Sequence, residues 1–125
     1  MKNLFIAGAI ALAALCSSQA YAFRNGDWVL AQWKGAKYWF PGVVDGTNGD
    51  LIRVRFDDGT VDARPSHQVK RYNWDVGSRV ECQWNSGVEW YPGRIASVGR
   101  DGETLEIRYD DGDAERTRTG KCRSR

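Results

Sequence analysis

The chain has 125 residues, of which 42% are hydrophobic, 27% charged and 12% aromatic. Its formal net charge of +2 excludes the strongly basic domain that is typical of a dedicated nucleic-acid-binding protein, so we expect no nucleic-acid partner. The aromatic content argues against a disordered chain, because aromatic side chains anchor a core.

The N-terminal segment has the three parts of a secretory signal peptide. Lys2 supplies positive charge, Leu4 to Leu15 is an uncharged apolar run, and Ala20-Tyr21-Ala22 is a small-x-small cleavage site. The apolar run is shorter than the roughly 20 residues that span a bilayer. We predict a signal peptide over residues 1–22, a mature chain of 103 residues without a membrane span, and export to the periplasm or beyond the cell.

The chain repeats itself. Residues 26–44 align with residues 77–95 at a shift of 51, with seven identities in nineteen positions. The identical pairs are Gly26/Gly77, Val29/Val80, Gln32/Gln83, Trp33/Trp84, Trp39/Trp90, Pro41/Pro92 and Gly42/Gly93. The match resumes at a shift of 53 and ends on Asp-Asp-Gly in both copies. A period of about 50 residues is typical of tandem structural units, so we predict domains over residues 23–73 and 74–125.

Each copy shows the period-two alternation of half-buried strands. Ile52, Val54 and Phe56 alternate with Arg53 and Arg55, and residues 104–109 repeat the pattern. Asp-Gly follows this strand in both copies and favours a tight hairpin, because Gly accepts positive φ. No segment after residue 22 shows a sustained helical period. We predict an all-β chain with five short strands per copy, closed into two small barrels that leave no exposed edges.

The shared motifs are Gly-x-x-Val-x-Ala/Cys-x-Trp, Trp-Phe/Tyr-Pro-Gly and Val/Ile-Arg-Phe/Tyr-Asp-Asp-Gly. This combination resembles a Tudor domain of the Tudor/agenet type, here as a tandem pair that covers nearly all of the mature chain. The resemblance implies two five-stranded SH3-like barrels. It also implies non-catalytic recognition of methylated lysine or arginine by a cage of aromatic side chains.

The resemblance places three aromatic residues and one acid of such a cage in each copy. These residues are Trp33, Phe40, Phe56 and Asp58 in the first copy and Trp84, Tyr91, Tyr109 and Asp111 in the second. A further aromatic position of the family is Thr60 in one copy and Asp113 in the other, so each cage is three-sided.

The physical chemistry of a cage favours the second copy as the cation site. Methylated ammonium groups have lost N–H donors and hydration, so they bind aromatic faces at about 0.5–2 kcal/mol per contact. A carboxylate at the rim adds selectivity for charge. The second copy has Tyr at both variable positions and an additional acid in Asp113, whereas the first copy has Phe at both.

A packing role is the alternative for the same aromatic residues. They could form the core of each small barrel or the contact between barrels. Trp39 and Trp90 fall on the opposite strand face from Phe40 and Tyr91 and fit such a packing role. The linker candidate Arg71-Tyr72-Asn73-Trp74-Asp75 has two aromatic residues, which also indicates that the barrels dock on each other.

The mature chain has two cysteines. Cys82 occupies the place of Ala31 in the repeat, and Cys122 occupies that of Val69. These are inward positions on the first and last strands, which lie close together in SH3-like barrels, so the resemblance implies a Cys82–Cys122 disulfide. Two buried free thiols are the alternative.

Neither the acidic nor the basic residues indicate catalysis. Asp57-Asp58 and Asp110-Asp111 lack the spacing of a calcium loop, and His67 has no nucleophile motif beside it. We interpret the basic residues of the C-terminus as a solvated edge strand and tail, with electrostatic contact to an anionic lipid, cell-wall polymer or nucleic acid as the alternative. These residues are Arg116, Arg118, Lys121, Arg123 and Arg125. We expect no cofactor, no metal and no enzymatic activity, although hydrolysis by a carboxylate pair stays open.

The sequence therefore predicts an exported, non-catalytic protein that recognises a methylated or cationic side chain or peptide. The alternative is a structural or envelope SH3-like module that binds a protein or polysaccharide partner.

Overall fold

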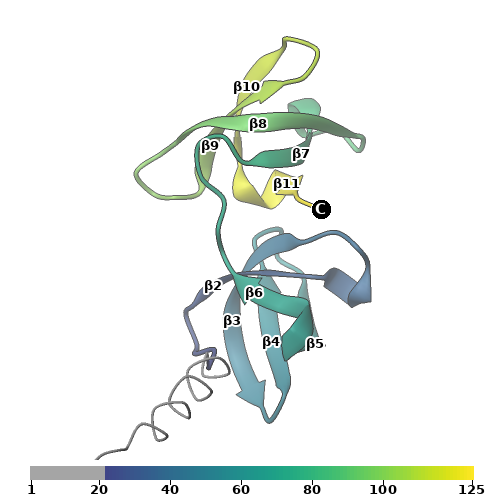
Figure 1. Cartoon of the computed structure of the whole chain (residues 1–125), viewed down its shortest axis with the longest axis vertical. Coiled ribbons are helices and arrows are strands. Elements are labelled where there is room, and N and C mark those ends of the chain that lie inside the picture. The colour runs from purple at the N-terminus through teal and green to yellow at the C-terminus, as the bar shows by residue number, and fades with distance from the viewer. Residues whose placement is uncertain (1–21) are drawn as a thin grey trace, which may run out of the picture.

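The computed structural model describes residues 22–125, so the predicted signal peptide lies outside the described residues except for Ala22. The described chain forms two five-stranded antiparallel sheets, one from each half, which lie one above the other in Figure 1. This arrangement confirms the predicted all-β fold of two tandem SH3-like barrels. Among the described residues, no helix is long and apolar enough to cross a membrane.

The first unit is the sheet with strand order β5-β4-β3-β2-β6. Its strands are β2 (Trp28–Ala31), β3 (Phe40–Asn48), β4 (Leu51–Phe56), β5 (Val61–Pro65) and β6 (Val69–Arg71). Two short 3-10 turns, η1 (Trp33–Gly35) and η2 (Ser66–Gln68), connect β2 to β3 and β5 to β6.

The second unit repeats this topology in the order β10-β9-β8-β7-β11. Its strands are β7 (Arg79–Gln83), β8 (Trp90–Val98), β9 (Thr104–Tyr109), β10 (Ala114–Arg118) and β11 (Cys122–Arg123). The 3-10 turns η3 (Trp84–Ser86) and η4 (Thr119–Lys121) stand in the places of η1 and η2.

The Pro-Gly motif of each repeat has a packing reason. Gly93 pairs with Tyr109 across the ladder, and a Cβ atom at Gly93 would lie 2.7 Å from the carbonyl oxygen of Arg108. Gly42 stands in the same relation to Phe56, with a clash of 2.7 Å against the oxygen of Arg55. Only glycine lets the long middle strand approach its neighbour this closely.

Each barrel has its own buried apolar cluster, built from the inward residues of the predicted alternation. The first contains Val29, Ala31, Val44, Ile52, Val54, Phe56 and Val69. The second contains Trp74, Val80, Cys82, Ile95, Leu105, Ile107, Tyr109 and Cys122, together with Leu30 of the first unit. Leu30 lies on the outward face of β2, and it is fully buried because the second unit covers it.

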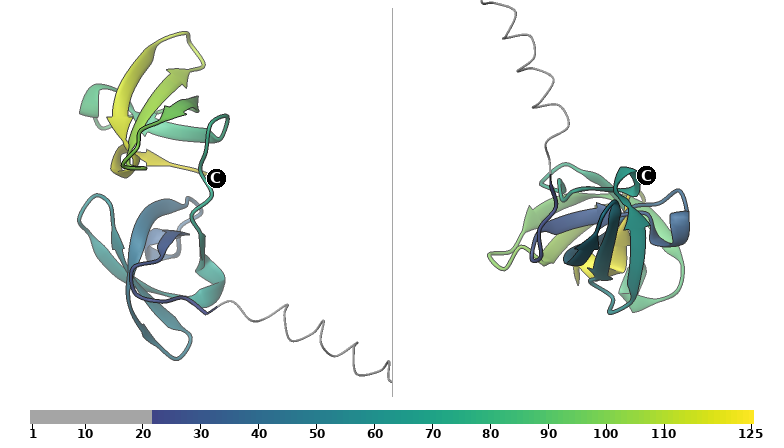
Figure 2. Two further views of the ribbon diagram at one scale, coloured as in Figure 1. Left: turned by 90° about the vertical axis from the view of Figure 1, so that its left-hand side faces the viewer. Right: turned by 90° about the horizontal axis from the view of Figure 1, so that it is seen from below.

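The two units therefore dock closely, in a region that we call the junction. Backbone hydrogen bonds join Trp39 and Ser124 in both directions, at 2.8 and 2.9 Å. Thr119 Oγ1 donates a hydrogen bond to Asp57 Oδ2 at 2.5 Å. Burial raises the pKa of the Asp57 carboxyl, and this hydrogen bond opposes the rise. The C-terminus lies at the level between the two sheets in Figure 1 and in the left view of Figure 2.

The linker takes part in this docking, as its two aromatic residues predict. The ring of Tyr72 lies 5.6 Å from those of both Trp28 and Trp74, measured between centroids. Trp74 is buried with the second core, and its indole nitrogen donates to Ser124 Oγ at 3.2 Å.

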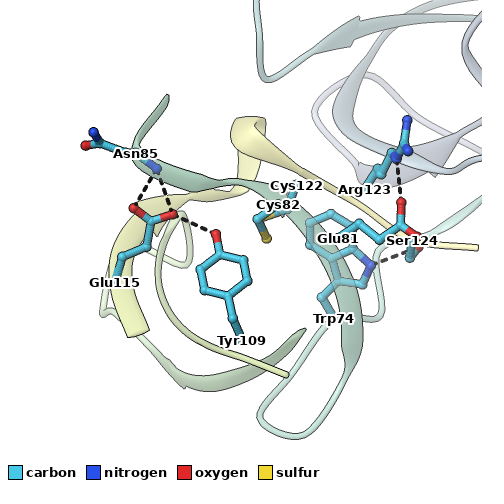
Figure 3. Close-up of a disulfide and its surroundings, with 9 residues drawn as sticks. All are labelled: Trp74, Glu81, Cys82, Asn85, Tyr109, Glu115, Cys122, Arg123 and Ser124. Carbon is cyan, nitrogen blue, oxygen red and sulfur yellow. Dashed lines mark hydrogen bonds and ion pairs between the residues drawn. A yellow bond between two sulfur atoms is a disulfide. The ribbon is translucent and has the colours of Figure 1, made fainter. Parts of the chain in front are cut away.

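The structure contains the predicted disulfide between Cys82 and Cys122 (Figure 3). The two cysteines are direct partners in the β7–β11 ladder, with a Cα–Cα distance of 4.1 Å. Both are fully buried. The bond therefore fastens the short last strand, at the edge of the second sheet, to its neighbour β7.

Candidate functional site: an aromatic hollow in the second unit

Three strand ends of the second unit meet around a hollow. Trp84 follows the end of β7, Tyr91 is the second residue of β8, and Tyr109 ends β9. The turn from β9 to β10 adds Asp111 and Asp113. These five residues line a cavity of about 220 Å³, which we call the aromatic hollow. The structure thus brings together all four residues that the resemblance assigns to the second cage.

The three aromatic side chains have different roles in the hollow. Tyr109 is only 4% exposed and belongs to the core, so its ring forms the floor. Trp84 and Tyr91 are 40% and 44% exposed and form the walls. The rings of Trp84 and Tyr109 meet edge to face, with centroids 5.7 Å apart. This arrangement offers aromatic faces to a group entering from solvent.

The rim of the hollow carries two carboxylates. Asp111 Oδ1 accepts a hydrogen bond from the backbone N–H of Asp113 at 2.9 Å, which shapes the turn. Within residues 22–125, no hydrogen bond or ion pair reaches the Asp113 carboxylate. Negative charge is therefore available at the mouth of an aromatic site, which favours a cationic ligand.

Glu115 links the floor of the hollow to the turn that carries one of its walls, Trp84 (Figure 3). Its carboxylate accepts the hydroxyl of Tyr109 at 2.6 Å and the backbone N–H of Asn85 at 3.1 and 3.3 Å. Asn85 has a left-handed backbone with φ of 54°, so this contact also supports the unusual turn that carries Trp84. Burial and the Glu115 carboxylate both raise the pKa of Tyr109, which stays a neutral phenol.

Two of the equivalent residues of the first unit, Phe40 and Phe56, are engaged in packing. Phe56 is 4% exposed in the core, and the ring of Phe40 packs edge to face against it, with centroids 6.5 Å apart. Trp90 of the second unit meets the same Phe40 ring at 6.0 Å. Phe40 therefore belongs to the junction between the units.

The remaining two residues of the first predicted cage lie at the surface. Trp33 is 37% exposed, and the ammonium of Lys34 lies 5.2 Å from its ring centroid. The Asp58 carboxylate is engaged by Thr60, which donates its N–H at 2.9 Å and its hydroxyl at 2.7 Å. The Lys34 ammonium therefore already lies over Trp33, and the Asp58 carboxylate already accepts hydrogen bonds within its own turn.

Sequence reasoning missed Glu115, although a signal was present. At the shift of 53, Glu115 aligns with Asp62, and Asp62 accepts the backbone N–H of Lys34 at 2.8 Å. Both copies thus hold their Trp-bearing turn by an acid from the strand after Asp-Asp-Gly. An acid at the same repeat position in both copies was the sequence signal.

A known protein family and a solved structure are similar to this chain. Residues 26–72, within the first unit, match the family model described as "DNA repair protein Crb2 Tudor domain". The structure described as "Crystal structure of ADCP1 tandem Agenet domain 3-4" is similar at 17% identity, with a TM-score of 0.37. That similarity covers 90% of this chain and 84% of the other. No curated protein matches the chain.

Proposed function

We propose that this chain is a non-catalytic binding protein whose second unit recognises a methylated or cationic side chain or peptide. The observation that carries the proposal is the aromatic hollow itself. Three aromatic residues and two carboxylates converge on one cavity, and Tyr109 fixes its floor. The match of the first unit to a Tudor family supports a binding role, because the second unit repeats its sequence and topology.

The geometry fits a cation better than a neutral or anionic group. Aromatic faces attract cations by about 0.5–2 kcal/mol each, most strongly where water is excluded. Asp111 and Asp113 add negative charge at the rim and can accept N–H groups that a partly methylated ligand retains. The ligand that fits best is therefore a methylated ammonium or guanidinium on a peptide, or a small quaternary amine.

We also propose that the protein acts outside the cytoplasm, in the periplasm or beyond the cell. Two features support this proposal: the N-terminal segment with the pattern of a signal peptide, and a disulfide, which persists in oxidising compartments. N-terminal sequencing of the protein from the envelope or medium should find Phe23 first. A chain that retains Met1 and stays in the cytoplasm would contradict it.

Calorimetric titration tests the binding proposal. The probes are peptides with trimethyl-lysine, dimethyl-arginine or unmodified lysine, together with choline. We expect binding of at least one methylated probe and an affinity about 2- to 30-fold weaker in Tyr91→Ala, since one aromatic contact is lost. Trp33→Ala is the matched control and should bind like the wild type. If no probe binds, the envelope module that contacts a protein or polysaccharide becomes the better function.

A further inference from the structure

The junction contains a second arrangement of aromatic rings, a carboxylate and a cation, and there the cation belongs to the chain. The guanidinium carbon of Arg123 lies 3.6 Å from the ring centroid of Tyr38 and 4.2 Å from that of Trp90. Arg123 Nε donates to Glu81 Oε1 at 2.9 Å (Figure 3). The guanidinium therefore contacts two aromatic rings and one carboxylate at once.

Burial separates this contact from an ordinary surface ion pair. The side chains of Arg123 and Glu81 are 17% and 20% exposed, whereas Arg125, which also reaches Glu81, is 68% exposed. Cation–π attraction is strongest where the cation is desolvated. The interpretation of the basic C-terminus as a solvated tail is therefore wrong for Arg123.

The repeat shows which parts of this arrangement are specific to the junction. In the first unit, Lys70 occupies the position of Arg123 and lies 4.2 Å from the centroid of Trp39, the equivalent of Trp90. The position of Glu81 is there Leu30. The second unit thus adds the carboxylate, and the first unit contributes the second aromatic wall, Tyr38.

Three further contacts surround the Arg123 site. Ser124, the next residue, forms the backbone bridge with Trp39, and the disulfide at Cys122 fixes the preceding position. Trp90, whose ring contacts Arg123, also packs against Phe40. The guanidinium is therefore at the centre of the contact between the units.

We propose that the junction is a guanidinium-binding site, formed by Tyr38, Trp90 and Glu81, whose resident ligand is the chain's own Arg123. Occupation of this site holds the two units together. The inference is independent of the function proposed for the aromatic hollow, because the two sites share no residue.

Chemical rescue of Arg123→Ala tests the proposal, with the indole N–H resonances of the tryptophans as reporters. In the variant, the Trp90 indole should shift while that of Trp84 stays in place. Millimolar methylguanidinium should then move the Trp90 resonance back toward its wild-type position in a saturable way. It should leave the same resonance in the wild-type protein unchanged, because the site is occupied there.

Three controls make the rescue specific. Lys70→Ala removes a cation that lies over one aromatic ring, and Arg125→Ala removes an exposed cation. In neither variant should methylguanidinium cause a saturable shift of the Trp90 resonance. Glu81→Gln combined with Arg123→Ala should weaken the rescue at least tenfold. Methylammonium, which lacks the guanidinium plane, should not replace methylguanidinium.

The proposal is wrong if methylguanidinium leaves Trp90 of the folded Arg123→Ala protein unmoved, or if it moves only Trp84. If Arg123→Ala does not fold, Arg123→Lys is used, which retains the charge without the plane. The expected result is then a shifted Trp90 resonance with an unchanged Trp84 resonance. A spectrum identical to that of the wild type would overturn the proposal.

Discussion

Glu115 shows how one half-buried acid can shape a binding site that it does not line. Its carboxylate joins the hydroxyl of Tyr109, in the floor, to the backbone of Asn85, next to Trp84. Asp62 performs half of this role in the first unit, where Phe56 has no hydroxyl to donate. The second unit therefore holds its floor residue by a hydrogen bond that the first unit lacks.

We predict that Glu115→Ala lowers both the stability and the ligand affinity of the second unit. The change leaves the Tyr109 hydroxyl and the Asn85 N–H without their acceptor, which costs about 1–3 kcal/mol of unfolding free energy. Urea unfolding and calorimetric titration measure the two effects. Asp62→Ala is the matched control, and it should lower stability without a change in ligand affinity. Unchanged affinity in Glu115→Ala would show that the hollow is positioned without it.

At the scale of the element, the short strand β11 depends on a covalent bond. It has two residues and pairs with β7, and the disulfide closes a loop with a sequence separation of 40. The first unit fills the same positions with Ala31 and Val69, which are both buried. The chain thus contains a disulfide-free version of the same strand pair for comparison.

We predict that Cys82→Ala combined with Cys122→Val, which copies the first unit, lowers the unfolding free energy by about 4 kcal/mol in the chain-entropy account. Equilibrium unfolding in urea measures the loss. Reduction of the wild-type protein should produce a loss of similar size, since the same cross-link is removed. Equal stability of the variant and the oxidised wild type would contradict a stabilising role.

The strands and turns were predictable from sequence because they depend on local patterns. Alternation over residues 51–56 and 104–109, Asp-Gly after each run and the matched positions of Cys82 and Cys122 are all local or repeat signals. The position of Phe40 in the junction was not predictable in this way. Its contact with Trp90 depends on how two whole units dock, and no pattern within one repeat contains that information.

At the scale of the whole molecule, docking makes the two repeats unequal. Leu30 and Trp39 of the first unit pack with the second core, and Phe40 meets Trp90 across the junction. The first unit therefore contributes Trp39 and Phe40 to the contact. The second unit keeps Trp84 and Tyr91 exposed around the aromatic hollow.

We predict that the wild-type protein unfolds in a single cooperative transition because the units share buried residues. Leu30→Glu introduces the residue that the second unit has at this position, where it would bury an unpaired charge against the second core. Differential scanning calorimetry should then show two separated transitions or a large decrease in Tm. One transition at an unchanged Tm would mean that Leu30 does not couple the units.

The central claim of this account is that the second unit binds a methylated cation while the first does not. An NMR titration of the wild-type protein with a trimethyl-lysine peptide and a dimethyl-arginine peptide, followed at the tryptophan indoles, tests it most directly. We expect the Trp84 resonance to shift and saturate with at least one of the two, at one ligand per chain, while the Trp33 resonance stays in place. Saturable movement of Trp33 with Trp84 unmoved would contradict the claim.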